Sequence, residues 1–130
     1  MDVKKLATEY HDKGFNCAQS VLCSCAGYTG LDEKTALAIS GGLGGGLRCG
    51  EVCGAVSGAV MAVGMCCQYI DSTDLETKDK IAELARYVTG EFTKEYGVIR
   101  CVDLKDASKP CAELIEFCAE LAEKTIKEKI

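Results

Sequence analysis

The sequence predicts an all-α protein: a compact bundle of five to six helices around a buried glycine-rich central helix. Apolar residues recur at helical spacing through most of the chain. Residues that cap helices, and glycines that end them, separate these stretches. No segment shows the apolar and polar alternation of a half-buried strand. Because 130 residues suffice for one hydrophobic core, we expect residues 1–130 to form a single domain.

Three helices are expected in the first part of the chain. The first has apolar residues at helical spacing and stops before Gly14. The second is capped by Asn16 and ends at Gly27, ahead of a turn. The third is capped by Asp32 and runs to about Ser40.

Glycine is concentrated in the middle of the chain, where nine of the 14 glycines lie between Gly41 and Gly64. Residues 41–50 are expected to form a loop, because glycine destabilises a helix interior. The uncharged stretch 52–70 is expected to be a buried central helix and not a membrane span, since charges bound it and polar residues interrupt it. A ridge of small residues, which favours close helix packing, recurs every four positions at Gly50, Gly54, Gly58 and Ala62.

Two helices are expected in the last part. Asp74 opens a long amphipathic helix that ends at Gly97. Residues 98–107 are expected to be a short extended or turn connection. Ser108 is then the expected cap of the final helix, with Pro110 in its first turn.

Charge and composition exclude several classes of function. The net charge is −5 and there is no basic patch, so nucleic acid is not an expected partner. The single histidine argues against serine-type triads and histidine-rich zinc sites. The first residues lack the apolar run of a secretion signal, which predicts a cytoplasmic protein. In a reducing compartment several of the ten cysteines are candidates for redox chemistry or metal binding.

Three cysteines fall where a helix is expected to begin: Cys17, Cys53 and Cys111. The unpaired amides and partial positive charge of a helix start favour a thiolate and lower the thiol pKa. Charged neighbours act in both directions, since Glu51 would oppose a thiolate, whereas Arg48, Arg100 and Lys109 could support one. A cysteine can equally be a small core residue. We expect that role for Cys23, Cys25, Cys66, Cys67 and Cys118, while Cys49 with Cys53 only weakly matches zinc-ligand spacing.

The segment 53–58 reads Cys-Gly-Ala-Val-Ser-Gly, follows Phe-Asn-Cys-Ala-Gln at 15–19, and precedes two further spaced cysteines. This order resembles the redox-active C-GCAxxG-C-C family from residue 15 to about 118. The resemblance implies redox chemistry at the four signature cysteines, Cys17, Cys53, Cys101 and Cys111. We expect Gly54, Ala55 and Gly58 to serve cofactor binding, since glycine lets backbone amides approach an anion, a disulfide partner or a cluster.

Several functions remain open for these residues. In the first, Cys17 or Cys53 attacks an oxidised redox partner protein or small thiol compound, and a second cysteine resolves the mixed disulfide. In the second, the four signature cysteines ligate an iron–sulfur cluster, although the spacing matches neither common ferredoxin pattern. Zinc on the same four cysteines ranks lower, because close cysteine pairs are missing. A binding module, such as a metal carrier or an adaptor that forms a homodimer through the small-residue ridge, is the remaining alternative.

Overall fold

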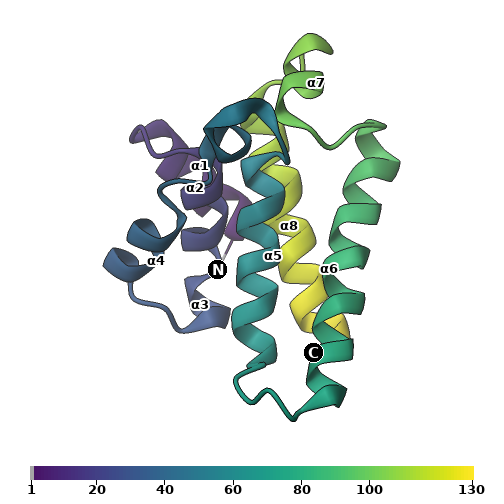
Figure 1. Ribbon diagram of the computed structural model, residues 1–130. Coiled ribbons are helices and arrows are strands. Elements are labelled where there is room, and N and C mark those ends of the chain that lie inside the picture. Colours follow the sequence, from purple (N-terminus) through teal and green to yellow (C-terminus); the bar gives the residue numbers. More distant parts are fainter. Residues whose placement is uncertain (1) are drawn as a thin grey trace.

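The computed structural model describes residues 2–130, and in that range it contains nine helical segments and no β-strand (Figure 1). The all-α class is therefore confirmed, but the expected number of five to six helices is wrong. The segments are α1 (Val3–Asp12), α2 (Cys17–Ser24), α3 (Ala26–Thr29), α4 (Glu33–Ser40), η1 (Gly46–Gly50), α5 (Gly54–Cys67), α6 (Leu75–Tyr96), α7 (Cys101–Asp106) and α8 (Cys111–Lys129).

The extra segments come from short local structures that periodicity did not separate. The expected second helix is two helices, because the backbone leaves helical geometry at Cys25 and Gly27 lies inside α3. A single five-residue turn, η1, interrupts the expected glycine-rich loop. The expected connection 98–107 contains the six-residue helix α7.

Side-chain caps fix several helix boundaries as predicted. Asn16 Oδ1 accepts a hydrogen bond from the Gln19 backbone amide at 2.9 Å, and the Asn16 backbone amide donates one to Gln19 Oε1 at 3.1 Å, which forms a capping box. Asp32 and Asp74 each accept a bond from an amide three residues later, at 3.1 Å. Gly97 ends α6 in the left-handed conformation. Ser108 is not the cap of α8, which begins after Pro110.

Helix α5 packs against α2, α6 and α8 (Figure 1). It is shorter than the expected 52–70, and Gly50 of the small-residue ridge lies outside it. A Cβ at Gly58 would stand 2.7 Å from the Ala18 carbonyl oxygen of α2, and Ala62 is fully buried. At Gly54 and Gly58 the ridge thus serves close packing against α2 inside the chain.

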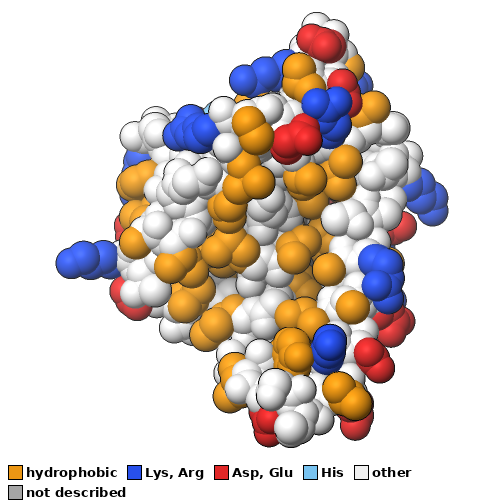
Figure 2. Space-filling model, in the orientation of Figure 1, with side chains coloured by type: hydrophobic (Ala, Val, Ile, Leu, Met, Phe, Trp, Pro, Cys, Tyr) orange, Lys and Arg blue, Asp and Glu red, His pale blue; other side chains and the backbone are white. Residues whose placement is uncertain are grey.

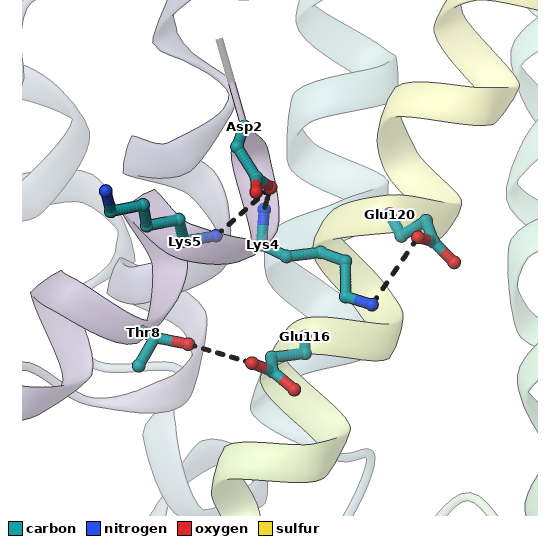
Figure 3. Close-up of polar contacts among 6 residues, drawn as sticks. All are labelled: Asp2, Lys4, Lys5, Thr8, Glu116 and Glu120. Atoms are coloured by element: carbon teal, nitrogen blue, oxygen red, sulfur yellow. Dashed lines mark hydrogen bonds and ion pairs between the residues drawn. The ribbon is translucent and has the colours of Figure 1, made fainter.

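Helix α1 is tied to α8 by polar contacts between residues more than 100 positions apart (Figure 3). Thr8 Oγ1 donates a hydrogen bond to Glu116 Oε1 at 3.1 Å, and Lys4 Nζ lies 3.7 Å from Glu120 Oε2. The Asp2 carboxylate caps α1 through the amides of Lys4 and Lys5. These contacts fix α1 beside α8, which also packs against α2.

Figure 2 shows hydrophobic side chains running down the face over α5, with acidic and basic side chains mainly toward the edges. Between residues 2 and 130, no helix has the length and apolar character needed to cross a membrane.

Candidate functional site

Each of the four signature cysteines lies at the start of a helix. Cys17, Cys101 and Cys111 are the first residues of α2, α7 and α8, and Cys53 directly precedes α5. Cys101 was expected in a loop, and its position at a helix start is a correction. Figure 1 shows α7 at the end of the molecule where α5 and α8 begin. The fold therefore gathers these helix starts at one end.

A short antiparallel backbone pairing joins the segment before α5 to the segment before α7. Val52 and Arg100 form an isolated bridge. On either side of it, the Cys53 amide donates to the Ile99 carbonyl at 2.9 Å, and the Cys101 amide donates to the Glu51 carbonyl at 2.6 Å. This pairing brings Cys53 and Cys101 together although 48 positions separate them in the sequence.

A close helix contact brings Cys17 to the same place. The Cys17 sulfur occupies the space where a side chain at position 54 would begin, so only glycine fits there. Because Gly54 follows Cys53 directly, the thiols of Cys17 and Cys53 are neighbours. Gly54 also lines the cavity formed here, whereas Gly58 faces Ala18 of α2 and Ala55 is fully buried.

All four signature cysteines line one cavity of about 220 Å³. Cys53 is only 4% exposed, Cys17 and Cys101 are half-buried, and Cys111 is exposed. The site thus contains one buried thiol and three thiols that solvent reaches. The ten cysteines of the chain are free thiols.

The thiols influence one another electrostatically. Burial raises the pKa of Cys53 to about 11; the amides of Ala55 and Val56 oppose this rise, and the charges of Cys17 and Cys101 add to it. Burial also raises the pKa of Cys111, followed by the charges of Cys17 and Cys101, while Lys105 opposes the rise. The expectation that a helix start lowers the thiol pKa is therefore wrong for both: desolvation outweighs the amides at Cys53 and outweighs Lys105 at Cys111.

Basic side chains complete the lining of the cavity: Arg48, Lys105, Lys109 and the single histidine, His11. No carboxylate lines it in the part of the chain that the structure describes. Arg48 and Lys109 were predicted as possible thiolate neighbours, but His11 and Lys105 were missed because they come from α1 and α7, far along the chain.

The two other charges considered from the sequence, Glu51 and Arg100, pair with each other. Arg100 Nε lies 2.8 Å from Glu51 Oε2, and Arg100 Nη1 lies 3.9 Å from Asp103 Oδ2. Neither Arg100 nor Glu51 lines the cavity. One guanidinium thus lies beside two carboxylates near the start of α7.

The segment 45–48 has four successive residues in the left-handed conformation, with φ between 60° and 64°. Two of them, Leu47 and Arg48, carry side chains, which is rare and costs roughly 1–2 kcal/mol per residue. The strained turn places Gly45 and Arg48 on the cavity wall. Strain of this kind concentrates at functional sites.

The remaining cysteines lie outside the cavity lining. Cys23, Cys25 and Cys118 are buried, and burial raises the pKa of each, to about 11 for Cys23 and Cys25. Cys66 and Cys67 are half-buried, and Cys49 is exposed. Within residues 2–130, no three histidine, cysteine or acidic side chains stand close enough together to hold a single metal ion.

The comparisons with known proteins agree with the cysteine pattern. No curated protein and no solved structure matches the chain. A family model described as "Putative redox-active protein (C_GCAxxG_C_C)" matches residues 15–125. That range contains all four signature cysteines and every segment from α2 to most of α8. The chain therefore belongs to the C_GCAxxG_C_C redox-active family.

Proposed function

We propose that this chain is a thiol–disulfide redox protein whose working groups are Cys17, Cys53, Cys101 and Cys111. The observation that carries the proposal is that these four thiols, drawn from four separate helix starts, line one cavity. Disulfide exchange needs an attacking thiolate and a second thiol within reach of the mixed disulfide. A cavity lined by four thiols can supply the attacking thiolate and the second thiol.

Cys17 is the attacking residue. It is half-buried, so a small substrate reaches it, and the Asn16 capping box fixes the first turn of the eight-residue α2. Its thiolate attacks one sulfur of a substrate disulfide. A bond forms between Cys17 Sγ and that sulfur, the substrate S–S bond breaks, and the leaving thiolate takes up a proton.

Cys53 is the resolving residue. Burial shields it from solvent oxidants but leaves it beside Cys17 across Gly54. Burial is the main cause of the raised pKa of Cys53, and the charge of Cys17 adds to it; once Cys17 is in a mixed disulfide, that second contribution is gone. Cys53 then loses its proton and attacks Cys17 Sγ, the second substrate thiolate leaves, and the protein has given up two electrons in a Cys17–Cys53 disulfide.

Cys101 and Cys111 return the site to its reduced form. Cys53 and Cys101 are held together by the backbone pairing, and Cys111 is the exposed thiol of the set. Exchange from Cys17–Cys53 to Cys101–Cys111 moves the disulfide to the surface without net oxidation. A reduced dithiol protein or small thiol then reduces it there and is itself oxidised.

The test maps disulfides by mass spectrometry after the reduced protein reacts anaerobically with a small neutral disulfide. We expect a Cys17–Cys53 disulfide in the wild type, a persistent mixed disulfide on Cys17 in Cys53→Ser, and neither product in Cys17→Ser. The control Cys49→Ser removes an exposed thiol outside the cavity and should behave as the wild type does. A mixed disulfide that clears as quickly in Cys53→Ser as in the wild type would contradict the proposal.

An iron–sulfur cluster on the same four cysteines is the second candidate. It is favoured by the number of thiols around one cavity and by the basic side chains beside them, which would offset the negative charge of a thiolate-ligated cluster. Absorbance, iron, zinc and acid-labile sulfide should be measured on anaerobically purified protein. A brown protein with iron and sulfide would replace thiol exchange by cluster chemistry.

A further inference from the structure

We propose that the oxidised substrate of the thiol site is a small anionic compound: an aliphatic disulfide that carries carboxylate or sulfonate groups. This inference rests on the proposed thiol exchange and adds the substrate class. Its basis is the charge of the cavity wall, which the redox chemistry alone does not require.

The cavity has a charge opposite to that of the whole protein. The chain has 20 acidic and 15 basic side chains, yet the described lining contains Arg48, Lys105 and Lys109 and no carboxylate. Within residues 2–130, no ion pair involves these three cations. Their charge is therefore available to a ligand.

Two carboxylates that lie near lining residues in the sequence, Glu51 and Asp103, are paired with a cation outside the cavity. Arg100 pairs with Glu51 at 2.8 Å and with Asp103 at 3.9 Å. Lys105 and Arg48 thus keep their charge directed to the site although two carboxylates lie close by in the sequence.

Two of the cations, Arg48 and Lys105, also line a second groove, which could hold the end of a longer molecule bound at the thiols. Arg48, Cys101 and Lys105 line both the cavity and an open adjoining groove of about 310 Å³, whose described lining also has no carboxylate. A disulfide bound with its sulfur atoms at the thiols can place charged groups on both sides of the S–S bond. Arg48 is held there in the strained left-handed conformation, which argues for a function of its guanidinium.

The chemistry is the exchange already described, with the charge carried by the leaving groups. Two protein thiols and one dianionic disulfide give one protein disulfide and two anionic thiols. Fixed cations raise the local concentration of an anionic substrate and stabilise the thiolate that leaves.

The test compares three disulfides with the same S–S–alkyl core: dithiodipropionate, hydroxyethyl disulfide and cystamine, which are anionic, neutral and cationic. For each, the rate of Cys17–Cys53 formation in the full chain is divided by the rate of the same disulfide with free thioglycerol, a neutral thiol that differs from all three products. At low salt we expect the normalised rate to be at least tenfold higher for the dianion than for the neutral compound, and lowest for cystamine. Added salt should reduce this preference.

Charge-removing variants identify the groups responsible. Arg48→Gln, Lys105→Gln and Lys109→Gln should each lower the normalised rate for the dianion about three- to tenfold, and lower the rate for the neutral compound clearly less, because only the dianion carries charge before its S–S bond breaks. Lys94→Gln removes an equal charge from an exposed position on α6 and should change neither rate.

The outcomes separate this inference from the proposed function. Equal normalised rates for all three disulfides would overturn the anionic substrate class while leaving thiol exchange intact. If none of them produces the Cys17–Cys53 disulfide, the proposed function itself fails.

Discussion

At the scale of one residue, Leu47 shows the backbone strain in the turn 45–48 beside the thiols. Its φ of 61° and ψ of 31° lie in the left-handed region, and 54% of its surface is exposed. We predict that Leu47→Gly is more stable than Leu47→Ala by about 1 kcal/mol, because glycine alone adopts this backbone without steric cost. Chemical denaturation of the two reduced variants measures the difference.

The same pair of substitutions at Lys94 is the control for this prediction. Lys94 lies in the last turns of α6 and is exposed. There the order should reverse, with glycine less stable than alanine by up to about 1 kcal/mol. An alanine variant as stable as the glycine variant at position 47 would show that the turn relaxes without strain.

At the scale of elements, the distance between α2 and α5 determines how Cys17 meets Cys53. A Cβ at Gly58 would lie 2.7 Å from the Ala18 carbonyl oxygen and 3.1 Å from Val21 Cβ. We predict that Gly58→Ala lowers the free energy of unfolding by roughly 1–3 kcal/mol, because the two helices must separate. It should also slow formation of the Cys17–Cys53 disulfide, which mass spectrometry of quenched samples measures.

Gly90 provides a matched substitution on another helix. It lies inside α6, and a Cβ there would meet nothing within 4 Å. Gly90→Ala should therefore raise the free energy of unfolding by up to about 1 kcal/mol and leave the disulfide rate unchanged. If both alanine variants gain stability, the contact between α2 and α5 is not as close as the structure gives it.

A helix could be predicted from the sequence where the residues that define its ends lie close together in the chain. Asn16, Asp32 and Asp74 cap helices through amides three residues away, so the sequence alone indicates them. Helix α7 depends on the pairing of residues 51–53 with 99–101, which no local pattern contains. Likewise, cysteine spacing identified Cys17, Cys53, Cys101 and Cys111, but only the fold shows that Lys105 and His11 join them.

At the scale of the whole molecule, buried thiols make stability depend on alkaline pH. Burial raises the pKa of Cys23, Cys25 and Cys53 to about 11, above the ordinary value of 9.0. The folded state therefore holds these protons more tightly than the unfolded state does. Their contribution to stability is complete below pH 9 and is lost as the pH rises toward 11 and beyond.

We predict that the free energy of unfolding falls by roughly 2 kcal/mol for each of these thiols between pH 8 and pH 10.5. Guanidinium titrations in a phosphine reductant measure it. Lysine and tyrosine also titrate in this range. The decisive quantity is therefore the difference in the free energy of unfolding between the wild type and Cys25→Ala, because the contributions of lysine and tyrosine are the same in both proteins and cancel. Cys25 is fully buried and lies outside the thiol cavity, so replacing it leaves the proposed site intact. The variant should be less stable at pH 8, and its deficit should shrink by about 2 kcal/mol at pH 10.5. A deficit that stays constant with pH would mean that Cys25 ionises as easily in the folded protein as in the unfolded chain, which its burial does not allow.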